Sequence, residues 1–216
     1  MSEQVIYGCA ADYGVELINR SGDGVLPVGV RDFVEAQDRC VLVDKTIFIA
    51  DVLDCDASVV VCCRPEGFGK SMNLSMLKAF LERPAGGRVD RNLFAGTQIW
   101  EADSGRFRDE FAGYPVISLD ISDAGRRGSV VAGVIREALS SECARLLELL
   151  EAPDLPRDKV RRIERVARGV ASDDEADSVL SVLVELLGMA CDEQVVLLVD
   201  GYDAAWLGRS AMRNAC

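Results

Sequence analysis

The 216-residue sequence contains no histidine. This absence excludes a Ser-His-Asp or Cys-His nucleophile system, an imidazole general base and any zinc site with a histidine ligand. Basic residues are also outnumbered, because 24 Lys and Arg stand against 36 Asp and Glu and give a formal net charge of −12. Duplex DNA binding requires a concentrated positive field, so this balance argues against a nucleic-acid partner.

Long apolar segments and paired cysteine motifs are missing as well. The longest apolar runs have about five to seven residues, far fewer than the roughly 20 that cross a membrane, and no signal peptide precedes them. The eight cysteines form no Cys-x-x-Cys pair, and their spacing fits neither a zinc ribbon nor a disulfide framework. We therefore expect a cytoplasmic protein with reduced cysteines, in which 49% hydrophobic residues supply the core.

The apolar patterns that are present predict alternating strands and helices. Continuous apolar runs at 59–63, 116–120 and 195–200 are typical of strands buried on both faces, as in parallel sheets. Shorter strands are predicted at 5–10, 15–18 and 41–43. Helical spacing predicts helices at 33–39, 46–53 (capped by Asp44 or Thr46), 71–82, 130–150, 159–170 and 174–190. This order indicates an α/β layered domain with a mostly parallel sheet.

A glycine-rich turn, Gly67-Phe68-Gly69-Lys70-Ser71, separates the predicted strand at 59–63 from the predicted helix at 71–82. Such a turn leaves backbone N–H groups unpaired at a helix N-terminus, and glycine permits the close approach of a phosphate. Lys70 would supply charge to terminal phosphates and Ser71 a hydroxyl to Mg²⁺. The usual phosphate-loop pattern begins with glycine where this chain has Arg64, so a chance likeness is the alternative.

An acidic strand end supports the nucleotide interpretation. The run at 195–200 ends in Asp200, the kind of position from which nucleotide-binding proteins hold Mg²⁺ beside the phosphates. The alternative is an acid that merely caps a strand end. Taken together, the two elements predict a P-loop NTPase-like site for ATP and Mg²⁺, with Ser71 and Asp200 as metal ligands.

Seven segments occur in an order that matches a known family. They are Leu26-Pro-Val-Gly-Val-Arg-Asp-Phe33, Val43-Asp-Lys-Thr46, Arg64-Pro-Glu-Gly-Phe-Gly-Lys-Ser71, Leu74-Ser-Met-Leu77, Leu93-Phe-Ala-Gly96, Tyr114-Pro-Val-Ile117 and Asp200-Gly-Tyr-Asp203. The chain thereby resembles the predicted AAA-ATPase-like family of bacteria and archaea, whose phosphate loop has Arg-Pro where the common motif starts with glycine. The resemblance implies a family domain over residues 26–216 after an N-terminal extension at 1–25. It also implies that Arg64 and the turn from Gly67 through Phe68 and Gly69 to Ser71 surround the nucleotide.

The chain departs from the family in the loop, at the acidic strand and in its extent. The family loop is similar to Arg-Pro-Arg-Arg-Phe-Gly-Lys, whereas Glu66 and Gly67 stand here in place of two arginines, which weakens attraction for a triphosphate. The acidic strand of the family reads Asp-Glu-Tyr-Asp, and its glutamate polarises the attacking water; Gly201 replaces it here, with Asp203 as a substitute. Family members continue past this strand, many into a restriction-endonuclease-like nuclease domain, so we expect an incomplete P-loop domain.

Three functions follow from these observations and stay open. The chain is an ATP hydrolase that uses Asp203 or a partner's residue, a nucleotide-binding module without turnover, or a non-catalytic remnant or fragment that acts as an interaction module with a protein partner. Of these, nucleotide binding with impaired hydrolysis is the expectation.

Three further features have two interpretations each. The basic segment 157–168 either contacts an anion or forms the charged face of an amphipathic helix, and the second is favoured because neighbouring acids dilute its field. Asp44 and Lys45 form a structural salt bridge or an adenine-side contact. Trp100 and Trp206 stack on a base or simply pack.

Overall fold

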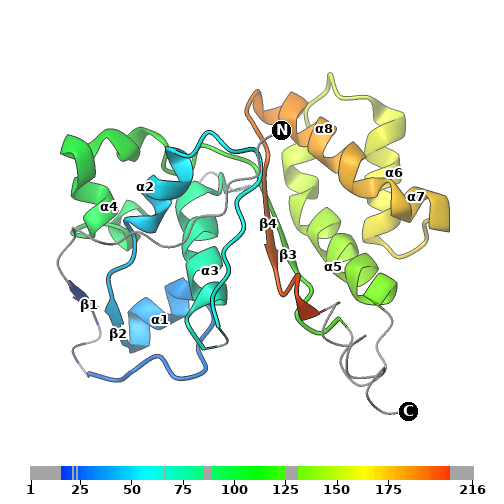
Figure 1. Ribbon diagram of the computed structural model, residues 1–216. Coiled ribbons are helices and arrows are strands. Elements are labelled where there is room, and N and C mark those ends of the chain that lie inside the picture. The colour runs from blue at the N-terminus through cyan, green and yellow to red at the C-terminus, as the bar shows by residue number, and fades with distance from the viewer. Residues whose placement is uncertain are drawn as a thin grey trace, which may run out of the picture. The chain divides into compact units, whose positions relative to one another are not determined.

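The structure is a computed structural model of the chain, which describes residues 16–20, 22, 24–65, 67–84, 89–124 and 131–204. The chain divides into two compact units, the first made of residues 1–82 and 88–112 and the second of residues 83–87 and 113–216 (Figure 1). The predicted phosphate loop, between Arg64 and Ser71, belongs to the first unit, and the acidic strand, which ends in Asp200, belongs to the second.

The helices and strands of each unit follow in chain order. The first unit contains β1 Leu17–Asn19, α1 Phe33–Arg39, β2 Val41–Val43, α2 Phe48–Leu53, α3 Lys70–Leu81, the 3₁₀ turn Arg91–Leu93, α4 Gln98–Glu101 and the 3₁₀ segment Ala102–Asp109. The second contains β3 Val116–Asp120, α5 Val131–Leu146 with the 3₁₀ turn Leu147–Leu150, α6 Arg157–Ala167, α7 Asp173–Asp177, α8 Val179–Cys191 and β4 Val196–Asp200.

An aromatic cluster forms the centre of the first unit. The ring of Phe94 lies 5.5 Å from that of Phe33, 5.0 Å from that of Phe80 and 5.7 Å from that of Phe111, measured between centroids. Phe80 and Phe94 are fully buried, and such edge-to-face pairs add to the free energy gained by burying the rings. The cluster fixes α1 and α3, the helix that follows the phosphate loop.

The second unit is built on a parallel strand pair. β3 and β4 align residue for residue from Val116 opposite Val196 to Asp120 opposite Asp200. Helices α5, α6 and α8 pack together beside this pair around a buried aliphatic core that includes Ile117, Ile163 and Leu186 (Figure 1). This core holds β3, which in turn pairs with the strand that ends in Asp200.

The outer edge of β3 is closed by two side chains of α5. The Ser118 N–H donates to Glu142 Oε2 at 2.9 Å, and the Val116 carbonyl accepts from Arg145 Nη2 at 2.8 Å. Arg145 also donates to both carboxylate oxygens of Glu142, which is only 7% exposed. The opposite edge of β3 pairs with β4, so the two side chains take the place of a neighbouring strand.

Most predicted elements are confirmed. The helix at 33–39 and the strands at 41–43 and 116–120 occur with the expected bounds, and the remaining predicted helices appear with ends shifted by a few residues. The segment 174–190 divides into α7 and α8, because Ser178 leaves the helical conformation. The α/β architecture with a small parallel sheet is confirmed, whereas the complete P-loop layered arrangement stays a prediction.

The strand predicted at 59–63 is wrong. Only Val60 forms an isolated β-bridge there, and Val59 is 46% exposed rather than buried on both faces. The described strands of the first unit, β1 and β2, pair antiparallel with each other. An apolar β-branched run has strand propensity, but a strand also requires a partner for its backbone groups.

Further expectations concern the N-terminal segment, the cysteines and membrane-spanning helices. Residues 5–10 lie outside the described residues, and β1 occupies Leu17–Asn19 instead of the expected 15–18. The assignment of 1–25 as an extension stays a prediction. None of the six described cysteines is in a disulfide bond. No helix in the described part of the chain is long and apolar enough to cross a membrane.

Candidate nucleotide site

The phosphate loop forms a glycine turn that leads directly into α3. Gly67 and Gly69 have φ angles of 83° and 77°, a left-handed conformation that residues with a Cβ rarely adopt. Gly69 is the N-cap of α3, and no side chain accepts a hydrogen bond from the backbone N–H groups there. No acidic residue occupies the first turn of α3, so the positive end of its dipole is not neutralised locally.

The side chains of the loop are arranged around this turn. Lys70 Nζ donates a hydrogen bond to the Arg64 carbonyl oxygen at 2.8 Å, which closes the loop on itself. Phe68 is 61% exposed at the tip. Ser71 lies in the first turn of α3, half-buried. The predicted residues Arg64, Gly67, Phe68, Gly69, Lys70 and Ser71 therefore form one continuous loop at a helix N-terminus.

The acidic strand presents two carboxylates at one end of the parallel pair. Asp200 ends β4, and Asp120 ends β3 directly opposite it. The Asp200 carbonyl accepts from the Ile121 N–H at 2.9 Å, which extends the pairing of the two strands to their carboxyl ends. Asp203 follows in a turn after Gly201, half-buried. Asp120 was not among the candidate site residues, although both predicted parallel strands end in aspartate.

Gly201 occupies a position that only glycine fits. Its φ is 73°, and a Cβ placed on it would lie 2.3 Å from Ser122 Cα and 2.4 Å from Ser122 N. These are backbone atoms that cannot rotate away. In this conformation the chain therefore cannot carry a glutamate directly after Asp200.

Asp44 and Thr46 are structural residues. Asp44 is 7% exposed; its Oδ1 accepts from the Thr46 N–H and hydroxyl, and its Oδ2 accepts from the Gln98 N–H at 2.9 Å. Thr46 Oγ1 in turn accepts from the Ile99 N–H at 3.0 Å. The pair thus caps the N-terminus of α4, and this network, rather than a salt bridge to Lys45, accounts for Asp44.

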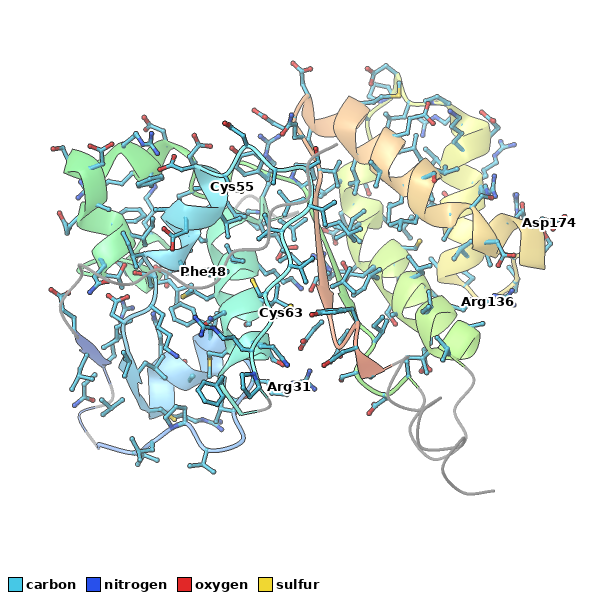
Figure 2. The ribbon with its side chains drawn as sticks, viewed as in Figure 1. Arg31, Phe48, Cys55, Cys63, Arg136 and Asp174 are labelled. Carbon is cyan, nitrogen blue, oxygen red and sulfur yellow. The ribbon has the colours of Figure 1, made fainter. Side chains whose placement is uncertain are left out.

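The basic helix α6 is paired with acids of its own unit. Arg165 bonds to Glu175 of α7, and Lys159 Nζ lies 2.5 Å from Glu185 Oε1 of α8. Arg162 donates to the backbone carbonyl of Asp174, which Figure 2 labels at the outer end of α7. Val160 and Ile163 are buried on the other face. The amphipathic-helix interpretation is the one these contacts support.

Trp100 packs within the first unit. Its ring lies 5.4 Å from that of Phe111, edge to face, and the Arg108 guanidinium lies 5.5 Å from its centroid. These contacts support the packing interpretation. Trp206 lies outside the described residues.

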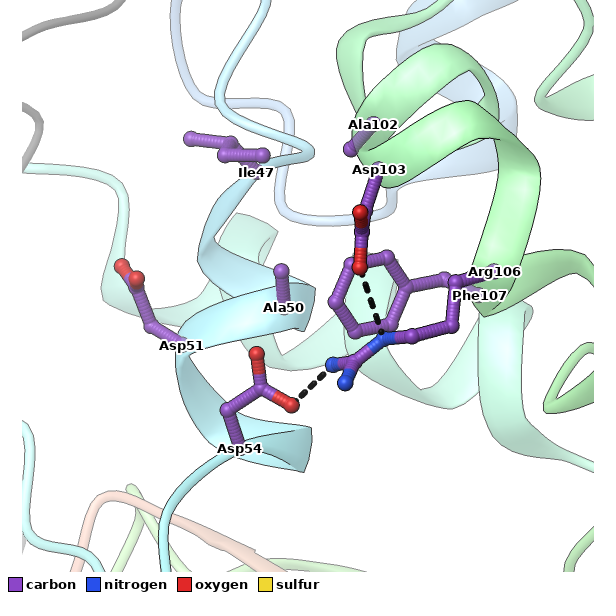
Figure 3. Close-up of a pocket in the computed structure, with 8 residues that line it drawn as sticks. All are labelled: Ile47, Ala50, Asp51, Asp54, Ala102, Asp103, Arg106 and Phe107. Atoms are coloured by element: carbon purple, nitrogen blue, oxygen red, sulfur yellow. Dashed lines mark hydrogen bonds and ion pairs between the residues drawn. The ribbon is translucent and has the colours of Figure 1, made fainter.

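A polar pocket of about 210 Å³ lies between α2 and the 3₁₀ segment Ala102–Asp109, apart from the phosphate loop residues (Figure 3). Arg106 reaches across it and forms ion pairs with Asp54 and Asp103. Burial, and then the neighbouring Asp54, raise the pKa of Asp51. Two of its three acids, Asp54 and Asp103, are already paired with Arg106, and we assign the pocket no ligand.

A comparison with family models identifies the chain. A model described as "Predicted AAA-ATPase" matches residues 27–213. The chain belongs to this AAA-ATPase-like family. No curated protein and no solved structure matches it significantly. The family implies use of a nucleotide, and the match includes both the phosphate loop and the acidic strand.

The predicted site residues at the start of α3 include groups of the kinds that bind phosphate and Mg²⁺. Left-handed glycines, an uncapped helix N-terminus and a lysine are the features that cradle a phosphate. Among the described residues no group of three His, Cys, Asp or Glu side chains could hold a metal alone. Mg²⁺ is usually held by one or two protein oxygens together with phosphates and water, and the Ser71 hydroxyl in the first turn of α3 is an oxygen of this kind.

Proposed function

We propose that the chain binds ATP with Mg²⁺ at the loop between Arg64 and Ser71. Lys70 and the backbone N–H groups at the start of α3 hold the phosphates, with Phe68 and Arg64 flanking them. Ser71 and Asp200 provide oxygen ligands to the ion, which would neutralise phosphate charge when bound. The observation that carries this proposal is the uncapped, left-handed glycine turn at α3 in a chain of the AAA-ATPase-like family.

Binding without efficient turnover is the form of this function that the chain supports best. The family's water-polarising glutamate is replaced by Gly201, and the Ser122 backbone occupies the space that a side chain would need there. Asp203 is then the carboxylate proposed for residual water activation, from a turn after the strand. We expect ATP affinity with hydrolysis far slower than that of an ATPase with the glutamate present.

Calorimetry with MgATP tests the binding proposal. The wild type should bind, and Lys70→Ala should lose about tenfold or more in affinity because a charge-assisted contact to phosphate is removed. Lys78→Ala is the matched control, since Lys78 lies in the last turn of the same helix and should leave the affinity unchanged. Absence of binding in the wild type, or equal affinity in Lys70→Ala, would refute the proposal.

A further inference from the structure

Lys45 lies between two fixed residues in the Val43–Thr46 segment that follows β2. Asp44 and Thr46 are both buried and hydrogen-bonded to each other and to the start of α4, whereas Lys45 between them is exposed. The flanking network therefore fixes the backbone from which the lysine side chain extends. A long, flexible side chain on a fixed backbone is confined to a small region of space.

The region that Lys45 reaches is the phosphate loop. Its Nζ lies 4.0 Å from the position that a Cβ would take on Gly69, the N-cap of α3. Within the described part of the chain Lys45 takes part in no ion pair and no hydrogen bond through its ammonium group. Lys70, by contrast, donates to the Arg64 carbonyl.

Several positive groups thus converge on one turn of a strongly acidic chain. The N-terminus of α3 has a partial positive charge, and neither a capping side chain nor an acid of the first turn neutralises it. An anion bound at this turn would be attracted both by the positive end of the helix dipole and by the exposed ammonium group of Lys45. A bound polyphosphate is the anion that the glycine turn is shaped to accept.

We propose that Lys45 is a second phosphate-binding lysine, whose ammonium contacts the phosphate chain of the nucleotide rather than its base. The inference rests on the proposed function, because it concerns the same loop. Lys45 thereby restores part of the positive charge that the loop lacks where Glu66 and Gly67 stand in place of two arginines. The side chain contacts the ligand directly and is exposed, so its removal leaves the core of the first unit intact.

The test compares two ligands that share only phosphates. Affinities for MgATP and for inorganic tripolyphosphate with Mg²⁺ are measured in the wild type and in Lys45→Ala, Lys45→Arg and Lys78→Ala. The affinity for tripolyphosphate is measured by competition against a fluorescent ATP analogue. We expect Lys45→Ala to weaken both ligands by the same factor of about ten or more, Lys45→Arg to retain most of the affinity, and Lys78→Ala to match the wild type.

Each outcome decides a different point. If Lys45→Ala weakens ATP but leaves tripolyphosphate unchanged, Lys45 serves the base or the ribose and the inference is overturned. Unchanged affinity for both ligands overturns it too, while the proposed function survives. If the wild type binds neither ligand, the proposed function fails and the role of Lys45 fails with it. Thermal unfolding of Lys45→Ala at the wild-type temperature confirms that the variant is folded.

Discussion

The backbone at Gly201 prevents a single substitution from restoring the family's glutamate, and with it ATP hydrolysis. A Cβ at this position would overlap the Ser122 backbone, and φ of 73° is unfavourable for any residue that has one. We therefore expect Gly201→Glu to lower the free energy of unfolding by at least about 2 kcal/mol and to leave ATP hydrolysis unrestored. Urea unfolding and phosphate release measure the two effects.

The control for Gly201→Glu is a glycine that has room for a side chain. Gly133 lies in α5 with ordinary helical geometry, and nothing lies within 4 Å of a Cβ added there. Gly133→Ala should stabilise the protein by about 0.5–1 kcal/mol through helix propensity. Full stability together with rapid hydrolysis in Gly201→Glu would show that the backbone at 201 adapts, and would contradict the expectation.

Single residues also show where sequence reasoning about the site ends. The glycine turn, Lys70 and Ser71 were predictable, because spacing along the chain alone places them at one helix N-terminus. The position of the Lys45 ammonium beside Gly69 was not predictable, since 24 residues separate the two and only the folded chain brings them together. The steric role of Gly201 against Ser122 was hidden for the same reason.

Helix α5 stabilises the acidic sheet through a nearly buried ion pair. Glu142→Ala would leave the Ser118 N–H and the Arg145 guanidinium without their carboxylate partner, so we expect a loss of about 2–4 kcal/mol in the free energy of unfolding. Glu164→Ala is the matched control within the same unit, because Glu164 pairs with Arg168 at the surface and its loss should cost at most about 1 kcal/mol. Equal losses in urea unfolding would disprove the edge-closing role of Glu142.

The contact between α6 and α7 makes stability depend on acid pH. A hydrogen bond from Arg165, followed by one from the Ser172 backbone, lowers the pKa of Glu175 from 4.5 to about 2. A carboxyl whose folded pKa is depressed contributes stability that is complete above its unfolded pKa and disappears as pH falls through its folded pKa. Glu175→Gln should therefore be less stable than wild type at pH 7, with a difference that shrinks between pH 4.5 and pH 2.

Urea unfolding at several pH values between 2 and 7 measures this difference, and Arg165→Ala should reproduce the same pH profile because it removes the same interaction. A difference that stays constant across the range would mean that the ion pair does not titrate as expected.

At the level of elements, sequence patterns predicted helices well, and they predicted a strand correctly where a second apolar strand was present to pair with it. The helix predicted at 33–39 begins where the Asp32 side chain accepts a hydrogen bond from the Glu35 N–H. The apolar runs predicted at 116–120 and 195–200 pair with each other as β3 and β4. The run at 59–63 has the same composition, yet it forms no strand. Whether a segment pairs as a strand depends on the tertiary fold and cannot be predicted from its composition alone.

For the molecule as a whole, the proposed function requires residues of both units to bind one nucleotide. The proposed ligands of Mg²⁺ come from different units, Ser71 from the first and Asp200 from the second. If one ion joins them, MgATP must slow amide hydrogen exchange at residues 67–71 and at 200–203 together, because binding stabilises both segments.

The variant Asp200→Asn tests whether Asp200 binds the same Mg²⁺ ion as Ser71. The substitution removes the carboxylate charge that attracts Mg²⁺ but keeps the size of the side chain, so packing at the end of β4 is preserved. We expect it to abolish nucleotide-dependent protection at 200–203 and to reduce the dependence of ATP affinity on Mg²⁺, while protection at 67–71 remains. Exchange in α6, which belongs to the second unit but to no proposed contact, should be unaffected and serves as the internal control. Protection confined to the first unit in the wild type would mean that the phosphate loop binds the nucleotide without the acidic strand, and Asp200 would then be only a strand-terminal acid.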